Sequence, residues 1–517
     1  MEASVMNPPA PTTEDIFRYR YQHGTNLGSI FVLEKWLHRS MHEKGSSGSS
    51  ELSAVTQSLK QHGLEATRLK WERHWQSALK EADIDWLRNV ARCNSIRLPI
   101  GYYTLGPRFC AGTPFEGDPA EVYAHAWNSV KKIIEDCYHH GIGVLLDLHA
   151  LPGGANTDSH SGTDSGKAEL WKVNHNLSLA TECVTFLLRE VSSHKMSNVI
   201  GIELCNEPSW GAASEVWKWY DQVLPLANEI DPSIPIYIGD CWNLPATLDY
   251  ALKRNAFSAT ATTLPNPVIV DSHKYYTFSA KDHNQSPQQI IARVKDSLAV
   301  VSQKEGNIFG RKTAAAVYIG EYSCTMDAKT WNKVDSSERP SLTRAFGNAQ
   351  TEKWQKKTSG SAFWTFKMDW MDGGDWGFKE QVKTGSIFPP VGLTLTKSDI
   401  VSKSERAEAQ RKDLRDTALS QHVGHWNKTA PNKKFEHSRY ESGWDLGYGD
   451  AMAFFCSRIN GTIPDRHQET RGDKIGAFEL WIRKRMVSTG QLTSSFGWEW
   501  EHGYRKGVRD FYQVVSI

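Results

Sequence analysis

The chain has 517 residues, of which 39% are hydrophobic and 23% charged, and this composition provides ample material for a large core. Lys and Arg number 60 and Asp and Glu 59, a balance that excludes a strongly basic nucleic-acid-binding protein and suits a neutral substrate. The mean hydropathy is −0.51 and no apolar run reaches ~18 residues, so we expect no transmembrane helix. The 20 Trp residues indicate an aromatic core, aromatic platforms in a cleft, or both.

The N-terminal residues have neither a basic start nor an apolar stretch of signal-peptide length. We therefore expect a cytoplasmic protein, or a secreted one from which a leader has been removed. The eight Cys residues form no CxxC pair, and we expect Cys205 and Cys324, beside strand-like segments, to be buried free thiols. The sequence predicts no metal site and no cofactor.

Short apolar, β-branched segments recur along the chain, and each ends in polar or Gly/Pro residues, as strands do. The predicted strands are 24–27, 95–99, 143–149, 199–206, 236–240, 268–273, 316–321 and 361–366. Most alternate with segments of helical period, such as 81–90 and 127–137. Strand–helix alternation repeated eight times predicts an α/β fold, a (β/α)₈ TIM barrel.

After Trp376 the strand–helix alternation ends. Segment 397–421 predicts a charged, solvated helix, segment 442–455 is apolar enough to be the final barrel helix, and segment 475–486 predicts an amphipathic helix. We predict one catalytic barrel whose main part is residues 1–396. Residues 397–517 would form a helical C-terminal extension that completes the barrel and packs on it.

Residues whose side chains can take part in catalysis or hydrogen bonding end or follow seven of the predicted strands: Arg97, His149, Asn206 with Glu207, Asp240, His273, Glu321 and Trp364. A barrel places its active site at the carboxyl ends of its strands, so we expect these residues to line one cleft. One such residue alone would be explained equally well as a strand cap, but seven together favour a site.

Two of these residues are carboxylates, Glu207 after the fourth strand and Glu321 at the end of the seventh. In a closed barrel the two strand ends face each other across the mouth. Glycoside hydrolysis needs two such carboxyl groups, one to protonate the departing oxygen and one to attack or stabilise the sugar centre. A separation of ~5–5.5 Å would predict retention of configuration through a covalent intermediate.

The chain also resembles a known family through an ordered set of motifs. These are Asn26-Leu-Gly with Leu-Glu34-Lys-Trp36, Arg97-Leu-Pro-Ile-Gly-Tyr102, Asp147-Leu-His149, Asn206-Glu207-Pro208, Asp271-Ser-His273-Lys-Tyr275, Gly320-Glu321-Tyr322 and Phe363-Trp364-Thr365. The set is similar to glycoside hydrolase family 5, of clan A, and within it to the fungal exo-β-1,3-glucanase group. The resemblance extends from about Gly24 to Trp376.

The resemblance implies roles for the residues around the two glutamates. Glu207 would be the acid/base and Glu321 the nucleophile. Arg97 would keep the nucleophile ionised, because a nearby cation lowers the pKa of a carboxyl group. Tyr275 would orient Glu321 through its hydroxyl. We expect the acid Glu207 to have a raised pKa and the nucleophile a normal or lowered one.

The resemblance also implies how a sugar would be held. Asn206 would hydrogen-bond the 2-hydroxyl, His149 and His273 would bind other hydroxyls, and Trp364 would form the floor under the sugar. Glu34 would contact the outer hydroxyls of a terminal glucose. Four further tryptophans would be either outer sugar platforms or ordinary packing: Trp210, Trp242, Trp370 and Trp376.

The sequence therefore predicts a retaining β-glycosidase that hydrolyses β-glucosidic bonds and resembles exo-β-1,3-glucanases and β-glucosidases. The loop after His149 departs from the family pattern, so a β-glucosidase or diglycosidase acting on flavonoid rutinosides or on steryl or ceramide glucosides stays an alternative. A non-catalytic carbohydrate-binding barrel is a third. We expect a carbohydrate or glycoside partner, no nucleic acid, no stable membrane insertion and no protein partner.

Overall fold

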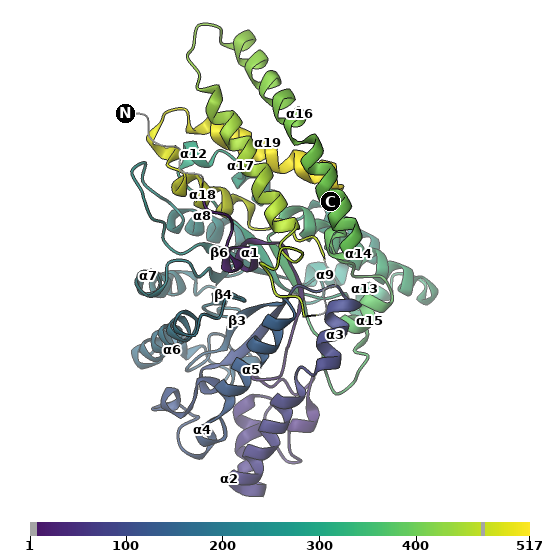
Figure 1. Ribbon diagram of the computed structural model, residues 1–517. Helices are drawn as coiled ribbons and strands as arrows, with labels where there is room; N and C mark the ends of the chain where they lie inside the picture. Colours follow the sequence, from purple (N-terminus) through teal and green to yellow (C-terminus); the bar gives the residue numbers. More distant parts are fainter. Residues whose placement is uncertain (1–7, 467–470) are drawn as a thin grey trace.

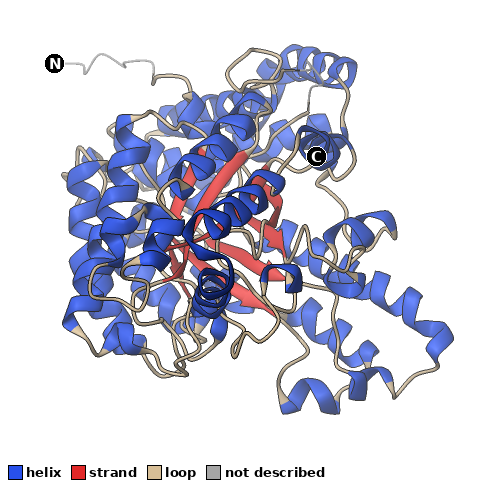
Figure 2. Ribbon diagram, turned by 90° about the horizontal axis from the view of Figure 1, so that it is seen from below, coloured by secondary structure: helices blue, strands red, loops and turns tan. Residues whose placement is uncertain are grey.

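A closed barrel of eight parallel strands, arranged in sequence order, forms the centre of the computed structural model, which describes residues 8–466 and 471–517. Helices surround it on all sides (Figure 2). The strands are β1 Gln22–Asn26, β2 Ser95–Gly101, β3 Gly143–Ala150, β4 Val199–Glu203, β5 Ile236–Gly239, β6 Val268–Lys274, β7 Val317–Tyr322 and β8 Gly360–Phe363. Each of the eight predicted strands overlaps one of them, so the predicted TIM barrel is confirmed. The first seven residues, used for the localisation prediction, lie outside the described part.

The strands are buried along almost their whole length, with only the end of β6 partly exposed. Parallel strands covered on both faces have no solvent side, which explains why runs such as Val144–Leu146 are continuously apolar. Charged residues inside such strands are therefore conspicuous, and the site described below is built largely from them.

Nineteen α-helices are present in the described residues, and they carry the labels of Figure 1. The barrel and its loops contain α1 Thr13–Tyr19, α2 Glu51–Ser77, α3 Glu81–Asn89, α4 Asp118–Val122, α5 Ala126–His139, α6 Asn174–Ser193, α7 Ala213–Ile230, α8 Leu244–Arg254, α9 Ala280–Asn284, α10 Pro287–Asp296, α11 Ala299–Lys304, α12 Ile308–Arg311, α13 Ala328–Trp331, α14 Arg339–Lys357 and α15 Phe378–Lys383. The remainder are α16 Lys397–Thr429, α17 His437–Phe455, α18 Phe478–Ser488 and α19 Gly497–Val515.

Helix α5 illustrates how the sequence specifies the outer ring. Its residues Trp127, Val130, Ile134 and Cys137 recur at helical spacing and all are buried, so one face packs on the barrel while the other is solvated. The predicted helices 81–90 and 127–137 correspond to α3 and α5.

The last four helices cover the amino-terminal end of the barrel. Their apolar side chains form one core with Ile200, Tyr237, Ile269 and Tyr318, each the second residue of its strand. Figure 1 shows α16, α17 and α19 gathered at one end of the molecule, with α2 at the other. The site-bearing ends of the strands therefore point away from these helices.

Helix α17 differs from its predicted role as the final barrel helix. It packs against α16 and α19, and α15 is the first α-helix after β8. Glycines explain the close approach: a Cβ at Gly443, Gly447, Gly503 or Gly507 would lie less than 3.0 Å from a carbonyl oxygen of the opposing helix. The apolar character of 442–455 therefore reflects a helix–helix contact in the extension.

Within the described ranges, none of the helices is both long enough and apolar enough to cross a bilayer.

Candidate active site

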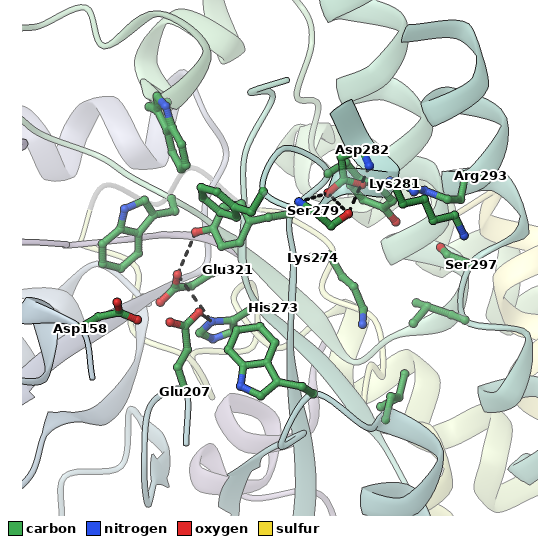
Figure 3. Close-up of a pocket in the computed structure, with 18 of the residues that line it drawn as sticks. Asp158, Glu207, His273, Lys274, Ser279, Lys281, Asp282, Arg293, Ser297 and Glu321 are labelled. Carbon is green, nitrogen blue, oxygen red and sulfur yellow. Dashed lines mark hydrogen bonds and ion pairs between the residues drawn. The ribbon is translucent and has the colours of Figure 1, made fainter. Parts of the chain in front are cut away.

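Eight of the nine residues predicted to form the site lie at the carboxyl end of the barrel, and the ninth, Arg97, lies inside the barrel on β2. A cavity of about 1130 Å³ opens at the carboxyl end, and seven of the nine line it: Glu34, His149, Glu207, His273, Tyr275, Glu321 and Trp364. Arg97 and Asn206 lie fully buried beside it and hydrogen-bond to each other. Figure 3 shows Glu207, from the loop after β4, converging with His273 of β6 and Glu321 of β7.

The two glutamates lie close enough to act on one bond. The imidazole Nδ1 of His273 is 2.7 Å from Oε1 of Glu207 and 3.5 Å from Oε2 of Glu321. An oxygen of Glu207, an oxygen of Glu321 and a nitrogen of His273 all lie within 4.8 Å of one another. This arrangement corresponds to the ~5–5.5 Å carboxyl separation of retaining glycosidases rather than to the wider spacing of inverting ones.

Glu321 is held at both carboxylate oxygens. Arg97 Nη1 donates to Oε1 at 2.9 Å, and the hydroxyl of Tyr275 donates to Oε2 at 2.8 Å. Two strong donors, one of them a charged guanidinium, fix the orientation of the carboxylate. A carboxylate held at both oxygens is positioned to attack an electrophilic carbon.

Arg97 is the centre of a buried polar network inside the barrel rather than at a strand end, since it is the third residue of β2. Its guanidinium contacts Glu203 in a bidentate pair at 2.8 and 3.0 Å. It also contacts Asp147 at 3.0 Å and Asn206 Oδ1 at 2.9 Å. Sequence reasoning missed Glu203 and Asp147, although acidic residues within otherwise apolar strands were the available signal.

Glu207 differs from the expectation of a raised pKa. Burial raises its pKa, but the hydrogen bond and charge of His273, with His160 and His149, outweigh burial and lower it to about 2. His273 itself is buried, which favours the neutral ring, yet Glu321, Asp271 and Glu207 raise its pKa well above the ordinary value. Three carboxyl groups around one imidazole explain both shifts.

Several buried polar atoms around the site have no hydrogen-bond partner among residues 8–466 and 471–517, and two of them belong to predicted site residues: Asn206 Nδ2 and Glu34 Oε1. Asn206 is oriented because its Oδ1 accepts from Arg97, and Glu34 because its Oε2 accepts from the indole of Trp36 at 2.8 Å. Burial raises the pKa of Glu34. A buried N–H donor and a buried oxygen acceptor that lack partners beside a cavity are suited to form hydrogen bonds with the hydroxyl groups of a ligand.

A flat surface formed by Trp364 and His149 lies beside these atoms. The two rings are stacked, with centroids 5.7 Å apart and planes 9° from parallel. Nδ1 of His149 is 2.7 Å from Oδ2 of Asp147, so the other ring nitrogen is left to face the cavity. Aromatic faces and imidazole nitrogens together match the C–H and O–H groups of a sugar.

Several cavity residues were not anticipated from the sequence. His160 and Asp158 come from the loop after β3, and Trp36 and Phe278 from the loops after β1 and β6. Of the four tryptophans considered as platforms, Trp242 and Trp376 line the cavity, whereas Trp210 and Trp370 are not among its lining residues. No strand or helix period marks loop residues, so their sequence carried no signal for them.

The cavity extends well beyond the glutamates. Figure 3 places Arg293 and Ser297 at the far side from Glu207 and Glu321. Four aliphatic residues line it in addition to the aromatic ones, and we call them the aliphatic wall: Leu244, Pro245, Leu298 and Val300. A volume of about 1130 Å³ exceeds the ~300–1,000 Å³ typical of small-molecule pockets.

Among the described residues, two clusters outside the site have side chains of metal-ligand type: Glu81, Asp85 and His140, and, in the helical extension, His422, His437 and Glu499. Both imidazoles lie 3.0 Å from Oε2 of Glu499, and the backbone N–H of Glu436 donates to Oε1 at 2.7 Å. These polar atoms pair with one another without an ion. Each of the eight cysteines is a buried free thiol in the described part of the chain, as expected for Cys205 and Cys324.

Two families match separate parts of the chain. The family described as cellulase (glycosyl hydrolase family 5) matches residues 52–367. The family described as the glucan 1,3-beta-glucosidase 3 C-terminal domain matches residues 407–515. The first match spans β2 to β8 of the barrel, and the second spans most of the helical extension.

Individual relatives agree with the family matches. Glucan 1,3-beta-glucosidase 3 of Schizosaccharomyces pombe is 31% identical over 493 residues, which span 95% of each chain. An uncharacterised glycosyl hydrolase of Saccharomyces cerevisiae is 28% identical over 517 residues, spanning 98% of this chain and 94% of its own. The crystal structure of rutinosidase from Aspergillus niger superimposes with a TM-score of 0.56 at 17% identity over 72% of this chain and 98% of its own, which shows a shared fold.

Proposed function

The chain belongs to glycoside hydrolase family 5, and on this premise we propose that it is a retaining β-glucosidase of the exo-β-1,3-glucanase type. The observation that carries the proposal is the pair Glu207 and Glu321, whose carboxylate oxygens lie within 4.8 Å at the bottom of one cavity. The name of the Schizosaccharomyces pombe relative, which matches over 95% of both chains, supports glucan as the substrate class.

In the first step Glu321 attacks the anomeric carbon of the bound glucoside while Glu207 donates its proton to the departing oxygen. The bond between the carbon and that oxygen breaks, and an ester between the sugar and Glu321 forms. Arg97 and Tyr275, which hold the two oxygens of Glu321, keep the nucleophile aimed at that carbon.

In the second step a water molecule attacks the same carbon and gives its proton to Glu207, which now acts as a base. The ester bond to Glu321 breaks, and both carboxyl groups return to their starting states. Two inversions at one carbon give net retention of configuration.

The buried polar atoms that have no hydrogen-bond partner in the described residues support recognition of a single terminal glucose. We assign Asn206 Nδ2 to the 2-hydroxyl, where a hydrogen bond strengthens toward the transition state. Glu34 Oε1 would accept from the outer hydroxyls, His149 and His273 would bind others, and Trp364 would support the sugar face. The buried carboxylate of Glu34, which lines the cavity, favours exo action, because a longer chain would have to displace it.

The aliphatic wall favours a second candidate, hydrolysis of glucosides of apolar small molecules or lipids. Leu244, Pro245, Leu298 and Val300 offer neither hydrogen bonds nor aromatic faces to a second sugar. They would instead contact an apolar aglycone, and this contact would stabilise binding by ~25 cal/mol for each Å² of apolar area that it buries. The same two glutamates would catalyse both reactions.

We further propose an intracellular location and a division of the chain into a catalytic barrel, 1–396, and a helical extension, 397–517. Eight buried free thiols suit a reducing compartment. The separate family match over residues 407–515 and the shared core of the last four helices support the division.

Product analysis on a matched panel tests the function: an aryl β-glucoside, laminarin oligosaccharides, a flavonoid rutinoside, and a steryl or ceramide glucoside. We expect single glucose units from laminarin oligosaccharides, with the β-anomer appearing first by proton NMR. Cleavage of the aglycone-linked substrates alone would select the second candidate. Absence of hydrolysis from the whole panel would refute both.

A further inference from the structure

Strand β7 contains one extra residue just before Glu321. Asp271 of β6 pairs with Tyr318 of β7. The next pair joins His273 to Glu321, so β7 advances by three residues while β6 advances by two. Such a bulge changes the face of the sheet to which the later side chains point. Tyr318 shares a core with the last four helices, whereas Tyr322 shares one with the buried face of α5, although strict alternation would place both on one face. The bulge therefore turns Glu321 toward the cavity.

Two buried side chains hold the backbone of Gly320, the residue before Glu321. The carboxylate of Asp271 accepts from the backbone N–H of Gly320 at 2.6 Å, and Nδ2 of Asn26 donates to its carbonyl oxygen at 2.8 Å. Both side chains are fully buried, and they come from β6 and β1. A bulge leaves its extra residue unpaired in the ladder, and these side chains supply the missing partners.

The carboxylate of Asp271 fits against β7 because position 320 has no side chain. A Cβ at Gly320 would lie less than 3.0 Å from both carboxylate oxygens. The second oxygen, Oδ2, lies 3.5 Å from Nε2 of His273 and 3.8 Å from Nε of Arg97. Burial raises the pKa of Asp271, but His273 and Arg97 outweigh burial and lower it. The acceptor at the bulge is therefore ionised, which strengthens its bond from the backbone N–H.

We propose that Asp271 and Asn26 are positioning residues that fix this bulge and thereby aim Glu321 at the anomeric carbon, an inference that rests on the proposed glycosidase function. Asn26 also connects to the side chain of the nucleophile. Its Oδ1 accepts from Nη1 of Arg97 at 3.0 Å, and the same Nη1 donates to Oε1 of Glu321 at 2.9 Å. One connected set of groups therefore holds both the backbone and the carboxylate of the nucleophile.

Loss of either hydrogen bond to Gly320 should slow formation of the glucosyl ester, which kcat/KM reports. A misplacement of about 1 Å costs on the order of 10²-fold, so we expect Asp271→Ala and Asn26→Ala each to lower kcat/KM on 2,4-dinitrophenyl β-glucoside by ~10–100-fold. Asp271→Asn keeps an oxygen that can accept from the N–H and should recover part of the loss. The two positions lie on different strands, so failure of one variant to fold leaves the others.

An external nucleophile separates positioning from general damage to the site. In Glu321→Gly, azide can attack the anomeric carbon from the side that the carboxylate occupied. A C–N bond forms, dinitrophenolate leaves with the electrons of the broken C–O bond, and the product is α-glucosyl azide. Azide needs no placement by β7, so adding Asp271→Ala or Asn26→Ala to Glu321→Gly should change this rate by less than ~3-fold. Dinitrophenolate leaves without a proton, so the acid does not enter the comparison.

Ser359→Ala is the matched control. The buried hydroxyl of Ser359 donates to the carbonyl oxygen of Val317 at 3.0 Å, so this variant also removes a side-chain hydrogen bond to the backbone of β7, but at its other end. We expect near-normal kcat/KM. Equal losses with Glu321 and with azide, or losses under ~3-fold in Asp271→Ala and Asn26→Ala, would overturn the proposal. A wild-type enzyme inactive on the glucoside would instead refute the glycosidase function.

Discussion

Replacement of Gly503 by Ala should destabilise the protein, although alanine is the better helix former. Gly503 lies in α19 and faces α17, where an added Cβ would meet the carbonyl oxygen of Tyr440 at less than 3.0 Å, against 3.4 Å or more for an ordinary contact. The obstacle is backbone on both sides, so no side chain can rotate away. The two helices must separate along a core that includes Trp444 and Trp500.

The magnitude follows from two opposing contributions. Alanine gains ~1 kcal/mol over glycine in a helix interior, whereas overpacking costs ~1–3 kcal/mol and more where backbone must move. Because the obstacle is backbone, we take the upper end of the overpacking cost, ~3 kcal/mol, and subtract the gain of ~1 kcal/mol. We therefore expect Gly503→Ala to lower the free energy of unfolding by about 2 kcal/mol. The matched control is Gly424→Ala in α16, where no atom lies within 4 Å of the added Cβ, and we expect stabilisation of up to ~1 kcal/mol.

Urea denaturation at 25 °C, followed by circular dichroism and Trp fluorescence, measures both changes. Activity of folded Gly503→Ala should be near that of the wild type, since the contact lies at the end of the barrel away from the cavity. Equal stabilities for Gly503→Ala and Gly424→Ala would refute the argument that α17 and α19 touch through their backbones.

Three further predictions concern the site and its supports. Glu321→Gln should lower turnover of an aryl β-glucoside by ~10⁴-fold or more while the circular dichroism spectrum is unchanged, and near-normal turnover would contradict its assignment as nucleophile. Arg97→Met should cost ~3–5 kcal/mol of stability by urea denaturation, because it leaves buried carboxyl groups without their cation; a loss under ~1 kcal/mol would contradict that account. Burial lowers the pKa of His23 to about 4. The unfolded chain therefore gains protons below pH ~6.5 that the folded chain does not, and the stability contributed by neutral His23 is complete above that pH and lost as pH falls toward 4. His23→Gln should flatten the stability profile in this window, and an unchanged slope would contradict the assignment.

The barrel could be predicted from the sequence because most strands, such as β3 and β7, combine a continuous apolar run with a polar residue at or near the end. Parallel strands of this kind are short, and a segment with helical periodicity separates each strand from the next. The number and order of the strands can therefore be predicted from the sequence. The role of α17 could not be predicted, because an apolar segment indicates that a helix is buried but does not indicate which element it packs against. Its glycines were the available clue, since they permit backbone contact.

Position at strand ends predicted part of the site, and the family resemblance predicted residues such as Glu34 that lie elsewhere. Glu207, Glu321 and His273 follow or end apolar runs, and that position made them candidates. Glu203 lies in the predicted strand that precedes Glu207, yet the role of a carboxylate inside a strand becomes evident only from its contact with Arg97. His160 belongs to a loop, and its contact with Glu207 depends on a chain path that no periodic pattern encodes.

The position of the extension has a consequence for synthesis and engineering. The amino-terminal floor of the barrel, with Tyr237 and Tyr318, is covered by helices that leave the ribosome last. A nascent chain ending near residue 396 would expose that floor, so chaperone contact is expected until translation finishes. The loops around the cavity share no core with those helices, which makes them the part of the chain where directed evolution for new aglycones should be tolerated best.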